Sequence, residues 1–274
     1  MRDSASSRDT MAPPDLTVAS PDEVMTVAAS RAIADGAVCF VGIGLPSAAA
    51  NLALRTHAPN AVLVYESGVI GARPDVLPLS IGDGELVDGA LTVVGVPEIF
   101  AYWLQGGRID VGFLGAAQVD RFANLNSTVI GTYERPATRL PGAGGAPEIA
   151  AAARETVVVV RHHPRTLVPH LDFVTSVGYP SEGRSRAALG LTGGGPSRVI
   201  TDLGVLEPDG DTRELTLTSV HEGIDVERVV SATGWPLRVS PNVRVLPPPT
   251  PTELATLRDL HARTAIAHSG GKRM

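Results

Sequence analysis

The sequence predicts an α/β fold, an open and mostly parallel or mixed sheet with helices on both faces. The first observation is a set of short runs that are apolar at every position, such as residues 37–41 and 111–114. A strand with one face in water would alternate polar and apolar side chains, so unbroken apolar runs are typical of strands buried on both faces. The second observation is that segments with helical spacing lie between these runs, an alternation characteristic of α/β proteins.

A capping box predicts the first helix. Ser20 can accept a hydrogen bond from the amide of Glu23, and the Glu23 side chain can reach back to the cap. Apolar residues then recur at helical spacing until Gly36, so we expect a helix over 21–35. Residues 1–19 are rich in Ser, Asp, Ala and Pro without such spacing, and we expect a mobile tail there.

The remaining elements follow the same two patterns. Strands are predicted at 37–41, 61–65, 111–114, 156–161, 173–177, 198–201 and 214–218, and a further apolar run lies at 91–96. Helices are predicted from Pro46 to Leu54, from Pro97 to Gly106, and near 148–154, 225–233 and 251–266. Short Gly- and Pro-rich links in the second half favour a mixed sheet over a uniform βαβ series. We expect one compact unit over 20–268, with a frayed C-terminus at 269–274.

Composition excludes several classes of function. The formal net charge is −6 with 23 Lys and Arg residues, so there is no broad basic field for nucleic acid or anionic lipid. No run approaches the roughly 20 apolar residues that span a bilayer, and the N-terminus has no apolar signal core. We therefore expect a cytoplasmic protein without nucleic acid or membrane partners.

The sequence has no metal-binding motif, no reactive cysteine motif and no serine-hydrolase motif. Cys39 lies within an apolar run, where a thiol is expected to pack in the core. His162, His163 and His170 have no Cys or acidic residue at ligand spacing, so we expect solvated histidines and no metal site. The Gly-x-Ser-x-Gly elbow of hydrolases does not occur.

Residues 42–46 form a glycine turn between a buried strand and a helix. Amides at such a position could receive a phosphate or carboxylate at the positive end of the helix dipole. The turn is not a dinucleotide fingerprint, because the third glycine and the ribose-binding acid are both missing. Gly42 and Gly44 are therefore either anion contacts or parts of a tight turn.

Glu66 is the most informative residue, because it follows the buried run 61–65 and precedes Ser67 and Gly68. Open α/β sheets place their ligands at the carboxyl ends of strands. A glutamate there is either a structural ion-pair or capping residue, or a nucleophile held in a cleft. The spacing alone leaves both interpretations open.

The segment Gly142-Ala143-Gly144-Gly145-Ala146 presents consecutive amides with almost no side-chain bulk before a predicted helix. A nest of N–H groups of this kind can stabilise a developing oxyanion. The alternative is a flexible surface turn.

Taken together, these segments resemble the β subunits of class I CoA transferases of the glutaconate CoA-transferase group. The similarity is strongest to members that act on 3-oxoadipate, and it spans about residues 24–265. The matching blocks are residues 25–29, 39–47, 65–68, 79–86, 112–120 and 142–146. One departure is visible, because the family usually has Gly-Asn where this chain has Ala123-Asn124.

The resemblance implies a function for each segment. It makes Glu66 the nucleophile. It implies that the amides of Gly144, Gly145 and Ala146 donate hydrogen bonds to the thioester oxygen. The residues expected to contact substrate are Gly42, Gly44, Ser67, Gly68 and Gly142. It implies succinyl-CoA as donor and a dicarboxylic or 3-oxo acid such as 3-oxoadipate as acceptor, with no cofactor besides the CoA thioester substrate. It also implies a hetero-oligomer in which the partner is an α subunit.

Two alternatives stay open. Some members of the fold lack the motif glutamate and catalyse hydrolysis or decarboxylation of CoA esters. The chain could also be a non-catalytic CoA-binding subunit.

Overall fold

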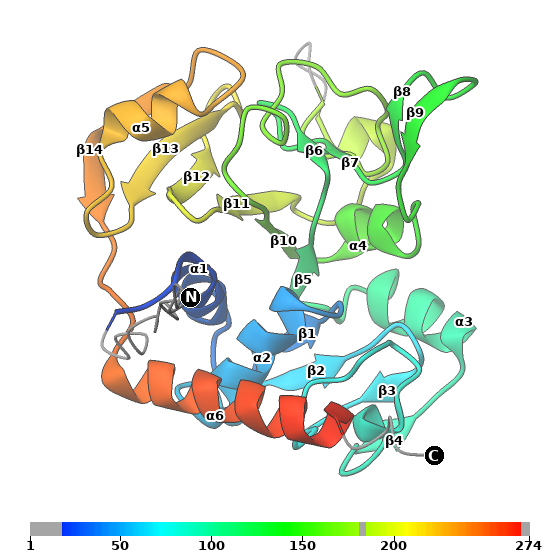
Figure 1. Ribbon diagram of the computed structural model, residues 1–274. Coiled ribbons are helices and arrows are strands. Elements are labelled where there is room, and N and C mark those ends of the chain that lie inside the picture. Colours follow the sequence, from blue (N-terminus) through cyan, green and yellow to red (C-terminus); the bar gives the residue numbers. More distant parts are fainter. Residues whose placement is uncertain (1–17, 181–184, 270–274) are drawn as a thin grey trace, which may run out of the picture.

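The computed structural model describes residues 18–180 and 185–269, and a ten-stranded sheet forms its centre (Figure 1). The strand order is β14-β13-β12-β11-β10-β5-β1-β2-β3-β4. The five strands from β11 to β2 pair in parallel, and both flanks of the sheet add antiparallel pairs. The predicted mixed, mostly parallel α/β sheet is confirmed. Most of the predicted tail and of the predicted frayed end, residues 1–17 and 270–274, lies outside the described residues.

The sheet strands are β1 (Val38–Phe40), β2 (Val62–Val64), β3 (Val69–Ile70), β4 (Thr92–Val93), β5 (Val111–Leu114), β10 (Glu155–Val159), β11 (Pro196–Ile200), β12 (Gly204–Pro208), β13 (Leu215–Val220) and β14 (Arg238–Val245). Two small hairpins are β6 (Gln118–Val119) with β7 (Leu125–Asn126), and β8 (Val129–Gly131) with β9 (Pro136–Arg139). The α-helices are α1 (Pro21–Ser30), α2 (Leu45–Arg55), α3 (Val96–Glu98), α4 (Ala146–Ala152), α5 (Val226–Ser231) and α6 (Pro251–Ser269). Short 3-10 turns are η1 (Gly84–Leu86) and η3 (Ala187–Leu189), and η2 (Ile99–Leu104) is a π-helix.

The α1 helix begins as the capping box predicts. The Ser20 hydroxyl accepts from the Glu23 amide at 3.2 Å, and the Glu23 carboxylate accepts from the Ser20 amide at 2.7 Å. The predicted end at residue 35 is wrong, because the helix stops at Ser30. The amides of Ala32 and Ile33 reach back only three residues, which tightens the chain into a turn.

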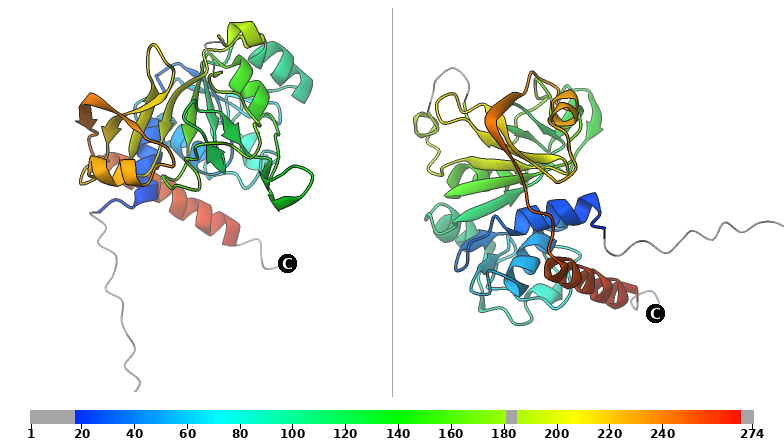
Figure 2. Two further views of the ribbon diagram at one scale, coloured as in Figure 1. Left: turned by 90° about the horizontal axis from the view of Figure 1, so that it is seen from above. Right: turned by 90° about the vertical axis from the view of Figure 1, so that its left-hand side faces the viewer.

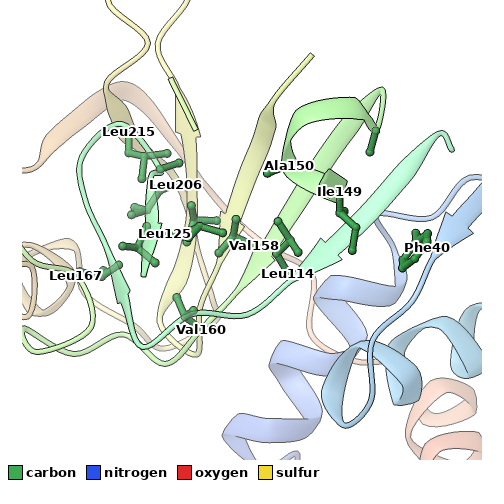
Figure 3. Close-up of a cluster of buried hydrophobic side chains, with 14 of the residues drawn as sticks. Phe40, Leu114, Leu125, Ile149, Ala150, Val158, Val160, Leu167, Leu206 and Leu215 are labelled. Carbon is green, nitrogen blue, oxygen red and sulfur yellow. The ribbon is translucent and has the colours of Figure 1, made fainter. Parts of the chain in front are cut away.

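The two faces of the sheet carry separate hydrophobic clusters. Strand side chains alternate between faces, so Phe40 joins one cluster while its neighbour Cys39 joins the other. The Phe40 cluster is covered by α4, and Figure 3 shows Ile149 and Ala150 beside Leu114 of β5. The other cluster is covered by α1 and α2. Helices on both faces and a buried Cys39 are thus confirmed, and burial raises the pKa of that thiol.

The C-terminal helix α6 returns to the N-terminal part of the fold and runs beside it (Figure 2). Two ion pairs tie it to α1 and the turn that follows, Arg258 with Glu23 at 2.6 Å and Arg31 with Glu253 at 2.7 Å. A third link is the hydrogen bond from the Leu77 amide to Thr264 at 2.9 Å. The helix therefore closes the layer that covers the α2 side of the sheet.

One predicted strand is absent. Residues 173–177 form only an isolated bridge, Ser176 to Leu125, instead of a strand. The apolar run 91–96 contributes just the two-residue strand β4, which is the exposed end of the sheet. Neither segment contributes a fully buried apolar side chain, although Val94 packs against the core.

Candidate active site

Glu66 occupies the turn that joins β2 to β3. The Gly68 amide donates to the Tyr65 carbonyl at 3.0 Å, which leaves Glu66 and Ser67 as the two central residues of the turn. Gly68 has φ +107, and a Cβ there would lie 1.9 Å from the carbonyl oxygen of Val94. Packing against the Val94 backbone alone therefore requires glycine at position 68, and its predicted substrate contact stays a prediction.

The alternation of side chains along β2 sets the direction of Glu66. The preceding residue, Tyr65, is fully buried in the cluster under α2, with its hydroxyl 3.2 Å from that of Ser47. Burial raises the pKa of Tyr65 to about 12, so the hydroxyl stays protonated as a hydrogen-bonding anchor. Glu66 faces the opposite side of the sheet, which is the side of α4.

The glycine turn before α4 meets Glu66 directly. A Cβ placed on Gly145 would lie 3.3 Å from the carboxyl carbon of Glu66 and 3.0 Å from Cζ of Phe100. The Phe100 ring also lies 6.5 Å from that of Phe40, centroid to centroid. The structure thus brings together Glu66 and the 142–146 segment, which are far apart in sequence, and adds an aromatic wall.

The Glu66 carboxylate is half-buried, and within 18–180 and 185–269 it has neither a hydrogen-bond partner nor an ion-pair partner. Within these residues Glu66 thus makes none of the contacts of an ion-pair or capping glutamate, and its role as a nucleophile stays a prediction. The neighbouring Ser67 hydroxyl is buried and also lacks a partner in the described structure. Unsatisfied polar groups are uncommon in native proteins, and they often mark a place where a ligand or substrate binds.

Not every amide of the 142–146 segment is available. The Gly142 amide donates to the Ser127 carbonyl at 2.9 Å, and the Ala146 amide donates to Ala143 at 3.0 Å. The amides of Gly144 and Gly145 have no acceptor among the residues that the structure describes. Gly144 and Gly145 are consequently the better placed of the predicted oxyanion donors, whereas Ala146 would have to break its turn.

The 42–46 turn lies on the same edge of the sheet. β1 and β2 pair in parallel with Phe40 opposite Val64, so continuing this register sets Gly42 opposite Glu66. Gly44 caps α2 with φ +81 and no side-chain hydrogen bond, and a Cβ on Gly42 or Gly44 would meet nothing within 4 Å. The turn is open, as an anion contact requires, but its role stays a prediction.

Phe100 belongs to the π-helix η2 and was not predicted from sequence. A hydrogen bond of 2.6 Å from Gln105 to Glu148 ties the residue after η2 to the first turn of α4. π-Helical segments often occur at functional sites, because the extra residue per turn redirects side chains. No sequence pattern here signals it, since Pro97 and Gly106 mark only the ends of the helix.

The histidines were predicted only in part. His163 and His170 are exposed, as expected, but His162 is buried, with ring nitrogens 3.0 Å from Thr201 and 2.9 Å from Thr233. Burial lowers the pKa of His162 to about 4, so the ring is neutral near pH 7. In the described parts of the chain, no cluster of three or more His, Cys, Asp or Glu residues could hold a metal ion. No helix in these parts has the length and apolarity needed to cross a membrane.

Residues 23–232 match the family model for coenzyme A transferases. The chain belongs to the coenzyme A transferase family. It is 59% identical to the B subunit of 3-oxoadipate CoA-transferase from Pseudomonas knackmussii, over 91% of this chain and 96% of the relative. The crystal structure of glutaconate CoA-transferase from Acidaminococcus fermentans superposes with a TM-score of 0.83 at 32% identity, covering 89% of this chain and 95% of that one.

The same fold also carries other chemistry. The decarboxylase AibA/AibB superposes with a TM-score of 0.76 at 28% identity, covering 89% of this chain and 95% of that one. The fold alone therefore does not distinguish a CoA transferase from a decarboxylase, and the distinction must come from the residues at the site.

The departure at Ala123 has a structural counterpart. Ala123 has φ +56, in the left-handed region that favours glycine, and its side chain is fully buried. The turn is held by Asp120, whose carboxylate accepts from the amides of Phe122 and Asn124, both at 2.9 Å. This CoA transferase therefore keeps the turn with alanine in a strained conformation.

Proposed function

We propose that this chain is the β subunit of a CoA transferase that moves CoA from succinyl-CoA to 3-oxoadipate, with Glu66 as the covalent nucleophile. One observation carries the proposal: the Glu66 carboxylate stands against a glycine turn, and neither the carboxylate nor the Gly144 and Gly145 amides have a partner among the described residues. The 59% identity to a 3-oxoadipate CoA-transferase chain supports the choice of acceptor. The succinyl-CoA donor follows from the family resemblance.

The first half of the reaction transfers the acyl group to Glu66. The carboxylate attacks the thioester carbonyl carbon of succinyl-CoA, and the negative charge on the carbonyl oxygen is stabilised by the Gly144 and Gly145 amides. The C–S bond then breaks, which releases CoA thiolate and leaves a mixed anhydride between succinate and Glu66. The thiolate attacks the Glu66 carbonyl of this anhydride, so succinate departs and a glutamyl-CoA thioester remains.

The second half runs in reverse with the acceptor. A carboxylate of 3-oxoadipate attacks the glutamyl-CoA carbonyl, CoA thiolate leaves, and a new anhydride joins Glu66 to the acceptor. The thiolate then attacks the acceptor carbonyl and frees the Glu66 carboxylate. Each step exchanges one acyl bond for another, and the protein contributes alignment and oxyanion stabilisation.

The Phe100 ring has a role in this scheme. A carboxylate in water is a weak nucleophile towards a thioester, so removing water from Glu66 favours attack. The aromatic wall at Gly145 shields one side of the carboxylate without offering a hydrogen bond that would stabilise its ground state. Glu66 has no charged partner among the described residues, which fits a nucleophile better than an electrostatic anchor.

Borohydride trapping tests the nucleophile. A glutamyl thioester is reduced to an alcohol while a free carboxylate is not, so inactivation should require prior exposure to succinyl-CoA. Peptide mass analysis should then find Glu66 converted to the alcohol, and a Glu66→Gln variant should remain unmodified. Equal inactivation without succinyl-CoA, or a modified peptide that lacks Glu66, would contradict the proposal.

We propose further that the β4 end of the sheet is the docking surface for an α subunit. Several large apolar side chains are exposed in residues 79–102, the segment that contains β4, and they are Leu79, Ile81, Val87, Leu91, Val93, Val96 and Tyr102. Exposed apolar groups gathered on one segment are typical of interaction surfaces. β3 and β4 are also the strands next to the Glu66 turn, so a partner docked here would lie beside the site.

Two matched variants test this surface. Val93 is 52% exposed on β4 and Val174 is 50% exposed in a loop away from that edge. We expect Val93→Glu to abolish co-purification with a tagged α subunit and Val174→Glu to leave it intact. If both variants retained the tagged partner equally, the β4 edge would be excluded as the interface.

A further inference from the structure

A cavity of about 450 Å³ lies apart from the Glu66 site. Its floor is formed by β11 to β14 on the sheet face that α1 covers, whereas Glu66 faces α4. None of its lining residues belongs to the Glu66 turn, the 42–46 turn or the 142–146 segment. The volume lies in the range of about 300 to 1,000 Å³ that is usual for small-molecule sites.

The walls of this cavity are largely apolar and are held in place. Val24 and Val27 of α1 form one side, and Leu246 with the prolines that follow forms another. Arg31 joins the two sides, since its guanidinium donates to the carbonyls of Pro247 at 2.7 Å and Pro248 at 3.0 Å. The cavity is therefore a preformed space, not a transient gap between loosely packed segments.

The floor of the cavity contains charged groups without partners. The Nε of Arg198 is buried and has no hydrogen-bond partner in the described structure. Glu207 on the next strand is half-buried, and across residues 18–180 and 185–269 it has neither an ion pair nor a side-chain hydrogen bond. Buried charges are normally paired, because desolvation without compensation is costly.

The sheet register makes the separation of these two charges informative. β11 and β12 pair with Val199 opposite Leu206, so the next position sets Arg198 opposite Glu207. Both side chains line the cavity, yet no N–O distance of 4 Å or less joins them. Two opposite charges that line one cavity but form no ion pair with each other can each bind one end of a ligand placed between them.

Two further polar groups lie next to this pair. His221 is buried, and its Nε2 donates to the Thr201 carbonyl at 2.8 Å, which leaves Nδ1 of the neutral ring as an acceptor. Ser219 is 2% exposed, and its hydroxyl has no partner among the described residues. The cavity thus offers the Arg198 cation, the Glu207 anion, a hydroxyl and an imidazole acceptor, and its lining also includes the exposed Glu222 and Arg244.

We propose that this cavity binds a small zwitterion with an apolar side chain, of the α-amino acid class. Its carboxylate binds Arg198, its ammonium group binds Glu207, and its side chain packs against α1 and the proline segment. A simple carboxylate would leave Glu207 unpaired and repelled, and a simple amine would do the same to Arg198. Only a ligand with both charges satisfies both ends of the site.

Three probes with one carbon skeleton test the proposal on the full-length chain. They are L-leucine, 4-methylpentanoate, which lacks the ammonium group, and 3-methylbutylamine, which lacks the carboxylate. Calorimetric titration should give saturable one-to-one binding of leucine, with each analogue weaker by about tenfold or more for its lost charge-assisted contact. Absence of leucine binding at tens of millimolar, or binding of either analogue as tight as that of leucine, would overturn the proposal.

Variants locate the binding. Arg198→Met and Glu207→Gln should each weaken leucine binding by about tenfold or more, and Arg228→Met, an exposed arginine on α5, should not. A saturating concentration of CoA should leave leucine binding unchanged, because the Glu66 site does not share these residues. Displacement of leucine by CoA, or retention of full affinity in both charge variants with unchanged thermal unfolding, would place the binding elsewhere.

Discussion

The turns that precede α2 and α4 are both rich in glycine, yet they meet different surroundings. Each ends in a glycine cap without a side-chain hydrogen bond, Gly44 or Gly145, and each helix has proline at its second position. A Cβ on Gly44 would meet nothing within 4 Å, whereas a Cβ on Gly145 would press on Phe100 and Glu66. One turn is open to solvent, and the other forms a wall of the site.

The two glycines are needed for different physical reasons. Gly44 has φ +81, a conformation that disfavours any side chain, so its backbone requires glycine. Gly145 has φ −83, which every residue adopts readily, so only its crowded surroundings require glycine. The comparison teaches how to select a catalytic candidate among glycine turns at the carboxyl edge of a sheet. The better candidate is the turn whose glycine is required by crowded neighbours and not by a positive φ.

The largest expected effect tests whether the 142–146 turn positions Glu66 for its reaction. Glu66→Asp withdraws the carboxylate by one methylene, and misplacement on the order of 1 Å can cost about a hundredfold in an aligned reaction. We therefore expect transfer to fall by about a hundredfold or more, with hydrolysis of the thioester as a growing share of turnover if water enters the gap. Glu66→Ala should lose both activities. Free CoA and acceptor-CoA would be measured with and without acceptor acid.

A matched control is Glu227→Asp, an exposed glutamate on α5. It should transfer CoA at the wild-type rate. A Glu66→Asp enzyme that also transferred at that rate, with normal circular dichroism, would show that Glu66 is not the attacking group.

The next effect tests the wall itself. Gly145→Ala should reduce kcat for transfer by about tenfold to a hundredfold, because the added methyl forces Phe100 or the Glu66 carboxylate to move. Stability should fall by about 1 to 3 kcal/mol, the usual cost of overpacking. Gly42→Ala is the control for stability and kcat, since its methyl would meet nothing within 4 Å, whereas a substrate contact at Gly42 would change KM. Thermal unfolding and kcat that are equal in both variants would remove the distinction between the two turns.

Much of this arrangement could be predicted from the sequence. The strand at 111–114 has the predicted bounds, because four apolar residues in succession have few other places in a soluble α/β fold. Glu66 was predicted as a candidate because the end of a buried strand is a generic ligand position. Its contact with Gly145 was not accessible, since nothing local links two residues from separate βα units.

The failures have physical causes too. Residues 173–177 have strand composition, but their backbone bonds to the β7 region instead of the main sheet, and tertiary pairing decides strand identity. β14 was missed because its residues alternate with charges at an exposed edge. Phe100 was missed because a π-helix departs from the 3.6-residue period on which helix patterns rest.

A smaller effect distinguishes backbone strain from ligand contact at Gly44 in the 42–46 turn. Gly44 and Gly36 have φ of +81 and +80, and a Cβ on either would meet nothing within 4 Å. Alanine at each position should therefore cost a similar free energy of unfolding, about 1 to 2 kcal/mol. If the 42–46 turn contacts CoA, Gly44→Ala alone should raise KM for succinyl-CoA. Equal KM values in the two variants would reduce this turn to a structural role.

The smallest effect concerns the α2 side of the sheet, which charged residues tie to α1 and α6. Hydrogen bonds from Arg258 hold the pKa of Glu23 at about 2, compared with 4.5 for a free glutamate. Burial raises the pKa of Glu253, but bonds from Arg31 and Thr250 outweigh it and lower that pKa to about 2. Because both folded-state values are depressed, their stabilisation is present above about pH 4.5 and is lost as pH falls towards 2.

Acid should therefore loosen α6 from α1 while the apolar contacts of α4 with the sheet persist. We expect the unfolding temperature to drop as pH is lowered from neutral to about 3, and Glu23→Gln to be less stable at neutral pH but to show a smaller drop. Both arginine partners are partly exposed, so solvent screening keeps each contribution modest. Glu227→Gln on α5 serves as the control and should follow the wild-type profile. If Glu23→Gln showed the full wild-type drop, the ion pair with Arg258 would not be the group that acid disrupts.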